Sequence, residues 1–457
     1  MANKKKVCSG ITKIQAVIIT VIIVLAAIIG AWSYLFLSGP KGPEAILVGI
    51  VAPITGYGAQ QGETVPCLVE YAENIVNNKW GGIYIKEAGK KVPIKFLIRD
   101  CQSDVALAKS LAEELITKDH IHFMLVPTGM EYQGVIAPVC ESYQIPTLCH
   151  LNIGLNAHLL GELNWVYLTC HSGSAFQLGT IEHLRKLDRK YNTNKRIGIL
   201  NPNNDFGQRN REQIGYWFDN TEFTIVDLGL YSLGIKDFTP YIEQLKAQKC
   251  DFCLTELWFE DGPIFWRQAL ELGYRPIAVK IGLAAVDPTG VAAIGGKLGH
   301  GITTTTVFSP NYPFRESLGG MTCQQLWNYY REKTGREGAT NLLIMAGIEV
   351  VVDVFKRAGS IDKYEVKKAL GDTSLYTCWG KVDFKAPYPS VLVPHLQKWE
   401  PGFIMYADHI SLQPNIVAQW YYENGRWIPK ITASVFPDIQ PEIEPFSIPY
   451  EELGYGK

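Results

Sequence analysis

Short apolar runs alternate with amphipathic stretches along most of the chain. The run Ala45–Ala52 is rich in Ile, Leu and Val, ends at Pro53 and a Gly-rich turn, and precedes a helical pattern over Glu63–Asn78. Such runs, bounded by Pro and Gly, are typical of strands buried on both faces of a parallel sheet. The strands expected further along the chain are Val92–Ile98, His122–Val126, Pro146–His150, Arg196–Leu200, Thr224–Leu228, Phe252–Leu257 and Ile277–Ile281. Stretches of helical period separate them, which predicts right-handed βαβ units and doubly wound sheets.

This pattern comes in two series, the first from Ala45 and the second from Tyr167. Two series predict two similar lobes, and a cleft between lobes is a common ligand site. We therefore expect an α/β fold of two doubly wound lobes joined by a multi-strand hinge. The expected assignment is residues 45–168 with 300–380 for the first lobe, 172–298 with 381–432 for the second, and 433–457 for a Pro-rich tail that forms a surface strap or stays disordered.

The N-terminal stretch has a different pattern. Residues 14–40 contain no formally charged side chain, and Lys4, Lys5 and Lys6 precede them. About 20 apolar residues suffice for a helix to cross a bilayer, and a lysine cluster marks its cytoplasmic side. We expect a basic head or prepeptide at residues 1–13, a transmembrane helix at 14–37 and a linker at 38–44, with the body extracytoplasmic at the cell membrane. A cleaved signal peptide and a buried soluble helix are the alternatives.

The composition indicates a globular protein and gives no sign of nucleic-acid binding. Apolar residues make up 47% of the chain and charged residues 19%, as in globular proteins, and the net charge of −2 gives no reason to expect nucleic acid as a partner. Ten cysteines suit an extracytoplasmic body in which some of them pair. The candidate disulfides are Cys67 with Cys101 and Cys323 with Cys378, although connectivity does not follow from sequence.

Signals for catalysis or metal binding are weak. Cys250 and Cys253 have a redox-like spacing, but they lie at the entry of an expected strand, where their side chains point to opposite faces. His120 and His122 also lie at a strand start, with no third ligand nearby in the sequence. The chain contains no G-x-S-x-G nucleophile motif, P-loop or dinucleotide fingerprint after a strand. We therefore expect no enzyme activity, no cofactor and no metal.

A candidate site does follow from the expected sheets. Ligands of doubly wound sheets bind beyond the carboxyl ends of the strands. In the first series, that edge holds Tyr57, the stretch Thr128–Tyr132 and the stretch Leu151–Ile153. Ordinary βα loops without a ligand are the alternative.

Many segments, in one order, resemble a known fold. They are GIVAPITGYG, NNKWGG, IKFLIRDCQSD, IAPVCESYQIPTL, TCHSGSAFQLG, NDFGQ, KDFTPYIEQLKAQKCDF, RQALELGYRPI, GKVDF and VAQWYYENGRWIPKI. Together they span residues 46–431 and resemble the type I periplasmic-binding fold, in particular the branched-chain amino-acid and amide-binding proteins of ABC importers. The basic head, Ser9-Gly10 and the apolar tract resemble the pilin-type signal peptides of some archaeal surface binding proteins, in which cleavage after Gly10 would leave the helix in place.

The resemblance implies a two-lobed receptor that closes on a small solute and delivers it to a permease in the membrane. Tyr57 matches the tyrosine that lines the pocket for the solute side chain. Glu131 or Tyr132, just after Thr128 and Gly129, falls where relatives place a serine that holds the solute carboxylate.

The resemblance extends to both lobes. Asn152 and Ile153 fall where relatives have a small residue and a threonine that also hold the carboxylate. Phe206, with Trp258 or Phe259, matches aromatic residues of the second lobe that close over the solute.

The chain departs from the family pattern where relatives hold an α-amino acid. Gly282 falls where relatives have an acid that pairs with the α-ammonium group, and the serine and threonine that hold the carboxylate are also missing. Burying a charge without a partner is costly, so an ordinary leucine-like solute does not fit. Glu256 could replace the missing acid and Glu131 could contact a cationic or amide group, or either could be a solvated loop acid. The expected solute is a small neutral, amide-bearing or cationic molecule.

The whole pattern therefore predicts a membrane-anchored solute-binding receptor of an ABC importer. The alternative on the same fold is a ligand sensor or a surface-assembly subunit whose N-terminal helix packs into a bundle. A hydrolase or oxidoreductase on this fold is disfavoured because the nucleophile constellation is missing.

Overall fold

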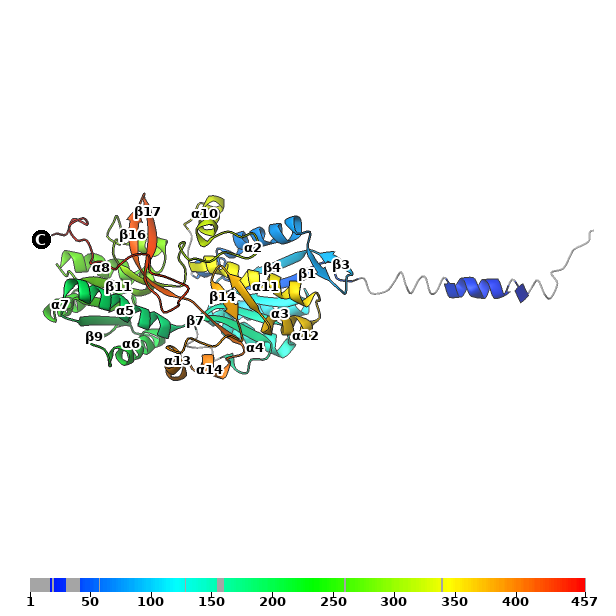
Figure 1. The fold of residues 1–457 in the computed structure, drawn as a ribbon, viewed down its shortest axis with the longest axis horizontal. Coiled ribbons are helices and arrows are strands. Elements are labelled where there is room, and N and C mark those ends of the chain that lie inside the picture. Colours follow the sequence, from blue (N-terminus) through cyan, green and yellow to red (C-terminus); the bar gives the residue numbers. More distant parts are fainter. Residues whose placement is uncertain are drawn as a thin grey trace, which may run out of the picture.

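Two α/β lobes lie side by side, joined by several passes of the chain (Figure 1). The computed structural model describes residues 17–18, 20–29, 42–56, 58–127, 129–153, 160–258, 260–337 and 340–456. Within this described part of the chain, six strands form the sheet of the first lobe and seven form the sheet of the second. The expected α/β class, with two lobes built on parallel sheets, is confirmed.

The first sheet has the order β15-β7-β6-β5-β1-β4, and its paired strands run parallel. Its strands are β1 (Ile46–Ala52), β4 (Ile94–Asp100), β5 (Phe123–Val126), β6 (Thr147–Ile153), β7 (Val166–His171) and β15 (Ile410–Gln413). The helices of this lobe are α2 (Val65–Glu73), α3 (Val105–Thr117), α4 (Met130–Tyr143), α10 (Cys323–Thr334), α11 (Ile344–Ala358) and α12 (Lys363–Gly371). On β1, Ile50 is buried against α2 and α11 and Val51 against α3 and α4. Burial on both faces explains why these strands read as continuous apolar runs.

The second sheet has the order β17-β16-β12-β11-β10-β8-β9. Its strands are β8 (Arg196–Pro202), β9 (Thr224–Tyr231), β10 (Phe252–Thr255), β11 (Ala278–Ile281), β12 (Thr303–Thr306), β16 (Ile416–Glu423) and β17 (Arg426–Ala433). Strands β16 and β17 pair antiparallel at one edge, whereas the other pairs except β12–β16 are parallel. Its helices are α5 (Gly173–Tyr191), α6 (Asp205–Phe218), α7 (Thr239–Ala247), α8 (Asp261–Glu271) and α9 (Pro288–Ala293). Helices α5 and α6 cover one face of this sheet, and α7, α8 and α9 cover the other.

Shorter elements complete the lobes. They are η1 (Ala59–Gln61), η2 (Asn74–Lys79), β2 (Ile83–Ile85), β3 (Lys90–Val92), η4 (Gly282–Ala285), η5 (Thr340–Leu343), β13 (Ser374–Thr377), β14 (Gly380–Asp383), α13 (Val393–Trp399) and α14 (Gly402–Met405).

The chain passes between the lobes three times within the described residues: between β7 and α5, after β12, and between β15 and β16. Two strands do not lie in the lobe that we expected from their position in the sequence. Thr303–Thr306 pairs in the second sheet and Ile410–Gln413 pairs with β7 in the first. Residues of α13 and α14, expected in the second lobe, bury Leu396 and Phe403 in the first. The sheet that a short strand joins depends on tertiary contacts, which its own pattern does not encode.

The tail after β17 forms a strap along the body. Ile439 and Ile448 are buried, and the Ile448 amide donates to the Ile277 carbonyl over 3.2 Å. The amide of Ile431 donates to the Glu442 carboxylate over 2.8 Å. Of the two expectations for residues 433–457, the strap is therefore the one that the structure supports.

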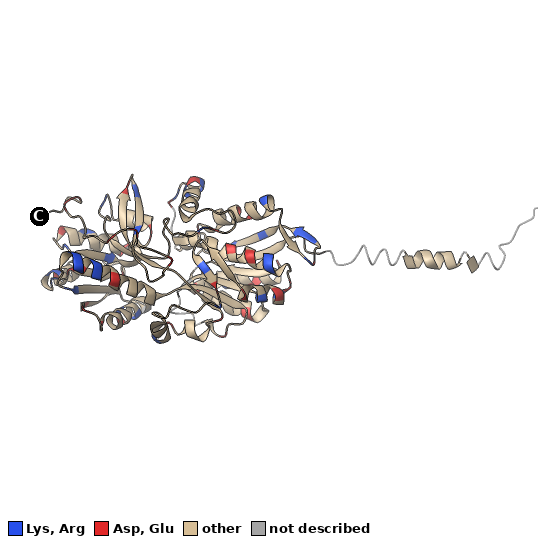
Figure 2. Cartoon of the chain, in the orientation of Figure 1, with Lys and Arg blue, Asp and Glu red and all other residues tan. Residues whose placement is uncertain are grey.

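Half of the expected transmembrane stretch 14–37 lies outside the described residues. Residues 20–29 are helical, with exposed apolar side chains and no charged residue (Figure 2). Among the described residues, no helix combines the length and the apolar character needed to cross a bilayer.

The expected disulfides are not formed. All nine described cysteines are buried free thiols, including Cys67 and Cys101. Cys323 and Cys378 are neighbours, but the Cys323 thiol donates to the Cys378 carbonyl over 3.3 Å. These cysteines therefore serve as small apolar core residues with a weak donor.

Candidate functional site

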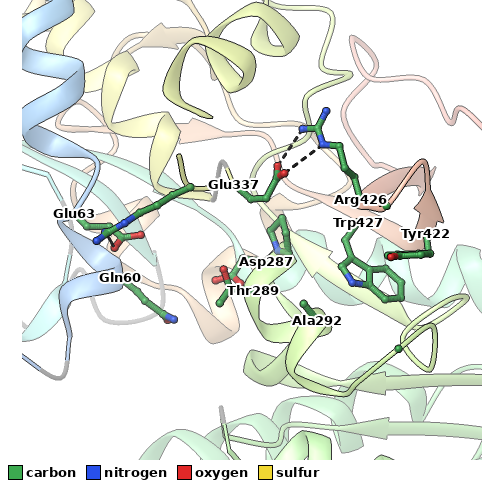
Figure 3. Close-up of a pocket in the computed structure, with 13 residues that line it drawn as sticks. Gln60, Glu63, Asp287, Thr289, Ala292, Glu337, Tyr422, Arg426 and Trp427 are labelled. Atoms are coloured by element: carbon green, nitrogen blue, oxygen red, sulfur yellow. Dashed lines mark hydrogen bonds and ion pairs between the residues drawn. The ribbon is translucent and has the colours of Figure 1, made fainter. Parts of the chain in front are cut away.

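A cavity of about 700 Å³ opens between the two lobes (Figure 3). The first lobe contributes Gln60, Glu63, Arg336 and Glu337. The second lobe contributes Asp287, Pro288, Thr289, Ala292, Gly296, Tyr422, Gly425, Arg426 and Trp427. Of the expected site residues that the structure describes, none lines this cavity. The sequence thus predicted a cleft between lobes but not the side chains that border its hollow part.

The loop after β1 forms part of the first-lobe wall and is fixed by hydrogen bonds. Asp100 accepts from the Ile54 amide over 2.9 Å and from the Thr55 hydroxyl over 2.6 Å. Burial alone would raise the pKa of Asp100, but these bonds and those from the Thr55 and Gln102 amides outweigh burial and lower it. Ser103 accepts from the Gly58 amide over 2.9 Å. Tyr57, the residue between these anchored positions, lies outside the described residues.

The first turn of α4 lies beside this loop. Gly129 has φ +76°, and a Cβ there would lie 2.3 Å from the Tyr132 ring, so both conformation and space require glycine. Tyr132 is fully buried in the core, whereas Glu131 is exposed and accepts from the Gln61 side-chain amide over 3.3 Å. Of the two alternatives, Glu131 is therefore the one that faces outward. Thr128 lies outside the described residues.

The carboxyl end of β6 holds the next pair of candidates. Asn152 and Ile153 pair with Cys170 and His171 of β7, after a register shift that follows Cys149. Their backbone therefore reaches the expected edge of the first sheet. Their side chains are outside the described part of the chain.

Two aromatic residues of the second lobe do come together. The rings of Phe206 and Trp258 pack edge to face, with centroids 6.4 Å apart and planes at 69°. Phe206 lies in the first turn of α6, which Asn204 caps by accepting from the Gly207 amide over 2.8 Å. Trp258 follows β10 and remains 36% exposed, and its amide donates to the Tyr231 hydroxyl over 3.0 Å. This pair offers an aromatic face to a ligand. Phe259 lies outside the described residues.

Glu256 has a partner that the sequence did not indicate. Its carboxylate forms an ion pair with Lys280, and each residue is only 8% exposed. Burial lowers the pKa of Lys280 to about 8, while the neighbouring carboxylate favours the charged ammonium. A lone lysine between Val279 and Ile281 was the available signal, because a buried strand rarely carries an unpaired charge.

Gly282 lies against this ion pair. It has φ +60°, and a Cβ there would lie 2.6 Å from the Glu256 Cα and 2.6 Å from its carboxylate. A larger residue does not fit without moving the backbone of Glu256. The position therefore has no room for an acid, because Glu256 and the Leu257 backbone fill the space around it.

The border of the cavity is charged but largely neutralised (Figure 3). Glu337 accepts from Arg426 over 3.0 Å at Nη2 and 3.3 Å at Nε, and Arg336 pairs with Glu63. Asp287 caps α9 by accepting from the Gly290 amide over 2.8 Å, and burial raises its pKa. Charged groups in loops and at the end of a strand follow no periodic pattern, so the sequence could not single them out.

An aromatic corner closes the second-lobe side of the cavity. The rings of Tyr422 and Trp427 are 4.9 Å apart at 54°, at the end of the β16–β17 hairpin. Among the described residues, no group of three metal-ligating side chains is present. His122 instead accepts from the Leu47 amide over 3.0 Å.

The comparisons with known proteins agree with this architecture. The family profile described as periplasmic binding protein matches residues 45–389. The Leu/Ile/Val-binding protein homolog 1 of Brucella abortus is 25% identical over 375 residues, which cover 79% of this chain and 90% of that protein.

Solved structures show the same fold. The branched-chain amino acid transporter substrate binding protein of Streptococcus pneumoniae, in complex with isoleucine, superposes with a TM-score of 0.62 at 16% identity, covering 85% of this chain and 99% of that one. A solute binding protein of an ABC transporter from Rhodopseudomonas palustris, in complex with 3,4-dihydroxy benzoic acid, has a TM-score of 0.63 at 17% identity, with 88% and 99% covered.

Proposed function

This chain belongs to the periplasmic binding protein family, and from that premise we propose that it is the solute-binding receptor of an ABC importer. The two lobes close on one small solute and present it to the permease. The observation that carries the proposal is the cavity of about 700 Å³, because residues of both lobes line it. Such a cavity changes shape whenever the hinge moves, which couples solute capture to closure.

Outside that cavity, the second lobe offers the solute an aromatic and electrically balanced surface, at the residues that the resemblance to the family assigns to the solute. Phe206 and Trp258 supply the aromatic faces. Glu256 is already paired with Lys280, and Gly282 has no room for an acid. At the positions of Glu256 and Gly282, no unpaired carboxylate is therefore available for an α-ammonium group. The solute proposed is therefore a small neutral, amide-bearing or cationic molecule, with the exposed Glu131 as the group that meets a cation or amide.

Calorimetric titration with leucine tests the solute class. Leucine added to the purified protein is expected to release no binding heat, because its carboxylate would lose water without gaining the serine and threonine that hold it in relatives, and its α-ammonium would meet no acid at Gly282. A panel with acetamide, an aliphatic amine and 4-hydroxybenzoate separates neutral, cationic and anionic solutes. Tight binding of leucine would overturn this part of the proposal.

The aromatic pair has its own test. Native mass spectrometry of the protein from its source identifies a co-purifying small molecule, which then serves as the probe. The W258A variant is expected to weaken its binding on the order of tenfold, through lost stacking. W80A, which removes the tryptophan directly after η2, is the matched control and should leave affinity unchanged. Equal affinity of W258A and the unaltered protein would place the solute elsewhere.

We further propose that residues 14–37 anchor the body to the membrane, outside the cytoplasm. The support is the absence of charged side chains over residues 14–40 and the exposed apolar residues of the helical stretch 20–29. The full chain should remain in the membrane fraction after a carbonate wash, and a chain lacking residues 1–40 should not. Full-chain protein in the supernatant would contradict the anchor. Oligomers that vanish on the same deletion would instead favour an assembly subunit.

A further inference from the structure

An ion pair joins the two lobes at the border of the cavity (Figure 3). Glu337 follows α10 in the first lobe, and Arg426 is the first residue of β17 in the second. Two bonds connect them, from Nη2 to Oε2 over 3.0 Å and from Nε to Oε1 over 3.3 Å. This fork-to-fork geometry is the strongest arrangement available to an arginine and a carboxylate.

Both partners are held in position by their own lobes. The Trp327 indole of α10 donates to Glu337 over 3.1 Å, and Arg331 lies 4.0 Å from the same carboxylate. Arg426 follows a tight turn in which Asn424 and Gly425 both have positive φ, the conformation of a two-residue hairpin. The side chains of Glu337 and Arg426 are 34% and 26% exposed, so water screens the pair only in part.

The pair is placed where hinge motion has its largest effect. Strand β16 begins just after the last passage between the lobes and runs eight residues to the turn before Arg426. At about 3.3 Å per residue, the turn lies on the order of 25 Å from that passage. Figure 1 shows the tip of this hairpin and α10 on the same side of the molecule. A rotation about the hinge that opens the cleft therefore moves Glu337 and Arg426 apart by more than it moves groups near the hinge.

We infer that Glu337 and Arg426 form a latch that holds the lobes closed over the cavity and so determines how readily the lobes open. The role of the latch in retaining a solute rests on the proposed function, whereas its effect on closure does not. Neither residue needs to touch the solute, because each acts through the position of its lobe. Opening of the lobes breaks the ion pair. Because salt screens the attraction between the two charges, the latch weakens as the salt concentration rises.

Distances between the lobes test the latch in the full chain, in detergent and without added solute. Spin labels on non-natural residues, one on the exposed face of α3 and one on that of α7, report the separation by pulsed electron resonance. The R426Q and E337Q variants should each shift the distribution to longer distances, and the charge swap E337R/R426E should shift it back. High salt should lengthen the distances in the unaltered chain but not in R426Q.

A matched control lies on the same hairpin. Lys430 pairs with Glu423 within the second lobe, so K430Q removes an ion pair without touching the interlobe contact. K430Q should leave the distance distribution unchanged. The inference is overturned if R426Q and E337Q keep the distances of the unaltered chain, or if K430Q lengthens them equally. Because no solute is added, a failure of the proposed function would leave this result standing.

Discussion

At the scale of single residues, the buried Lys280 determines the character of the second-lobe wall. The pairing register of β10 and β11 sets Leu254 opposite Lys280, which brings the lysine to Glu256 at the end of β10. The two residues are far apart in the sequence, and only the parallel pairing joins them. The sequence offered Glu256 either as a group for the solute or as a solvated loop acid. It did not indicate the pairing with Lys280, because neither strand alone encodes the register between two strands.

Removing the lysine should be costly. K280M leaves the Glu256 carboxylate buried without a partner, and we expect a loss of about 3–5 kcal/mol in the free energy of unfolding. The double variant E256Q/K280M should recover most of this loss, since neither charge remains. Urea unfolding followed by tryptophan fluorescence measures both. K430M is the control, because its ion pair is partly exposed and worth roughly 0–1 kcal/mol. A K280M loss no larger than that of K430M would show that Glu256 does not need its partner.

A second residue-scale prediction concerns pH. His150 is fully buried; its Nε2 lies 2.7 Å from the Leu343 carbonyl oxygen, and its Nδ1 lies 2.6 Å from the Thr169 hydroxyl. Burial lowers the pKa of His150 to about 4, although the bond to Leu343 acts in the other direction. Between about pH 6.5, the pKa of an unfolded histidine, and pH 4, the unfolded state binds this proton and the folded state does not. The contribution of neutral His150 to the free energy of unfolding is therefore fully present above pH 6.5 and falls as the pH drops towards 4.

The variant H150Q should lose part of this dependence. Between pH 7.5 and pH 4.5, the fall in unfolding free energy should be smaller in H150Q than in the unaltered protein by about 2–3 kcal/mol. Urea titrations at the two pH values measure the difference. H150Q should still lose some unfolding free energy at low pH, because burial also lowers the pKa of His183, to about 3. An equal decrease in unfolding free energy in both proteins would show that His150 does not contribute to the pH dependence.

At the scale of elements, the apolar runs predicted the central parallel strands well. The run His122–Val126 corresponds to β5, and Phe252–Leu257 corresponds to β10, each with an end shifted by one or two residues. Two strands next to the passages between the lobes were not predicted. Thr303–Thr306 has no apolar residue, and Ile410–Gln413 is too short to stand out, so both strands exist because a neighbouring strand offers hydrogen bonds.

The start of α5 gives an element-scale prediction. Glu400 accepts from the Ser172 hydroxyl over 2.6 Å and from the Gly173 and Ser174 amides over 2.9 and 3.1 Å, at the first passage between the lobes. Burial raises the pKa of Glu400, although these bonds oppose the rise. A carboxylate at a helix N-terminus is favoured by the helix dipole. E400A should therefore lower the unfolding free energy by about 2–3 kcal/mol, because it leaves buried donors unmatched.

Thermal and urea unfolding check this prediction. E444A is a suitable control, because the Glu444 side chain is 73% exposed and its pair with Lys186 is a surface contact. If E400A unfolds at the same urea concentration as E444A, the N-terminus of α5 does not depend on Glu400.

At the scale of the whole molecule, the C-terminal strap is part of the second lobe rather than an appendage. Ile448 and Tyr450 pack on the core formed by α8 and β11, and Arg275 lies between the rings of Tyr450 and Tyr455. Full burial of one large apolar side chain is worth about 1.5–3 kcal/mol. Deleting residues 434–457 should therefore lower the unfolding free energy by more than about 3 kcal/mol. A chain lacking only residues 456–457 is the control, and equal urea midpoints for the two would contradict the prediction.

The interleaved order of the two sheets has a consequence for how the protein is made. The first sheet is complete only when β15 has been synthesised, and the second only when β16 and β17 have followed. A nascent chain that leaves the ribosome from its N-terminus therefore carries two unfinished sheets until its last fifty or so residues emerge. Neither lobe can therefore complete its sheet until nearly the whole chain has been made.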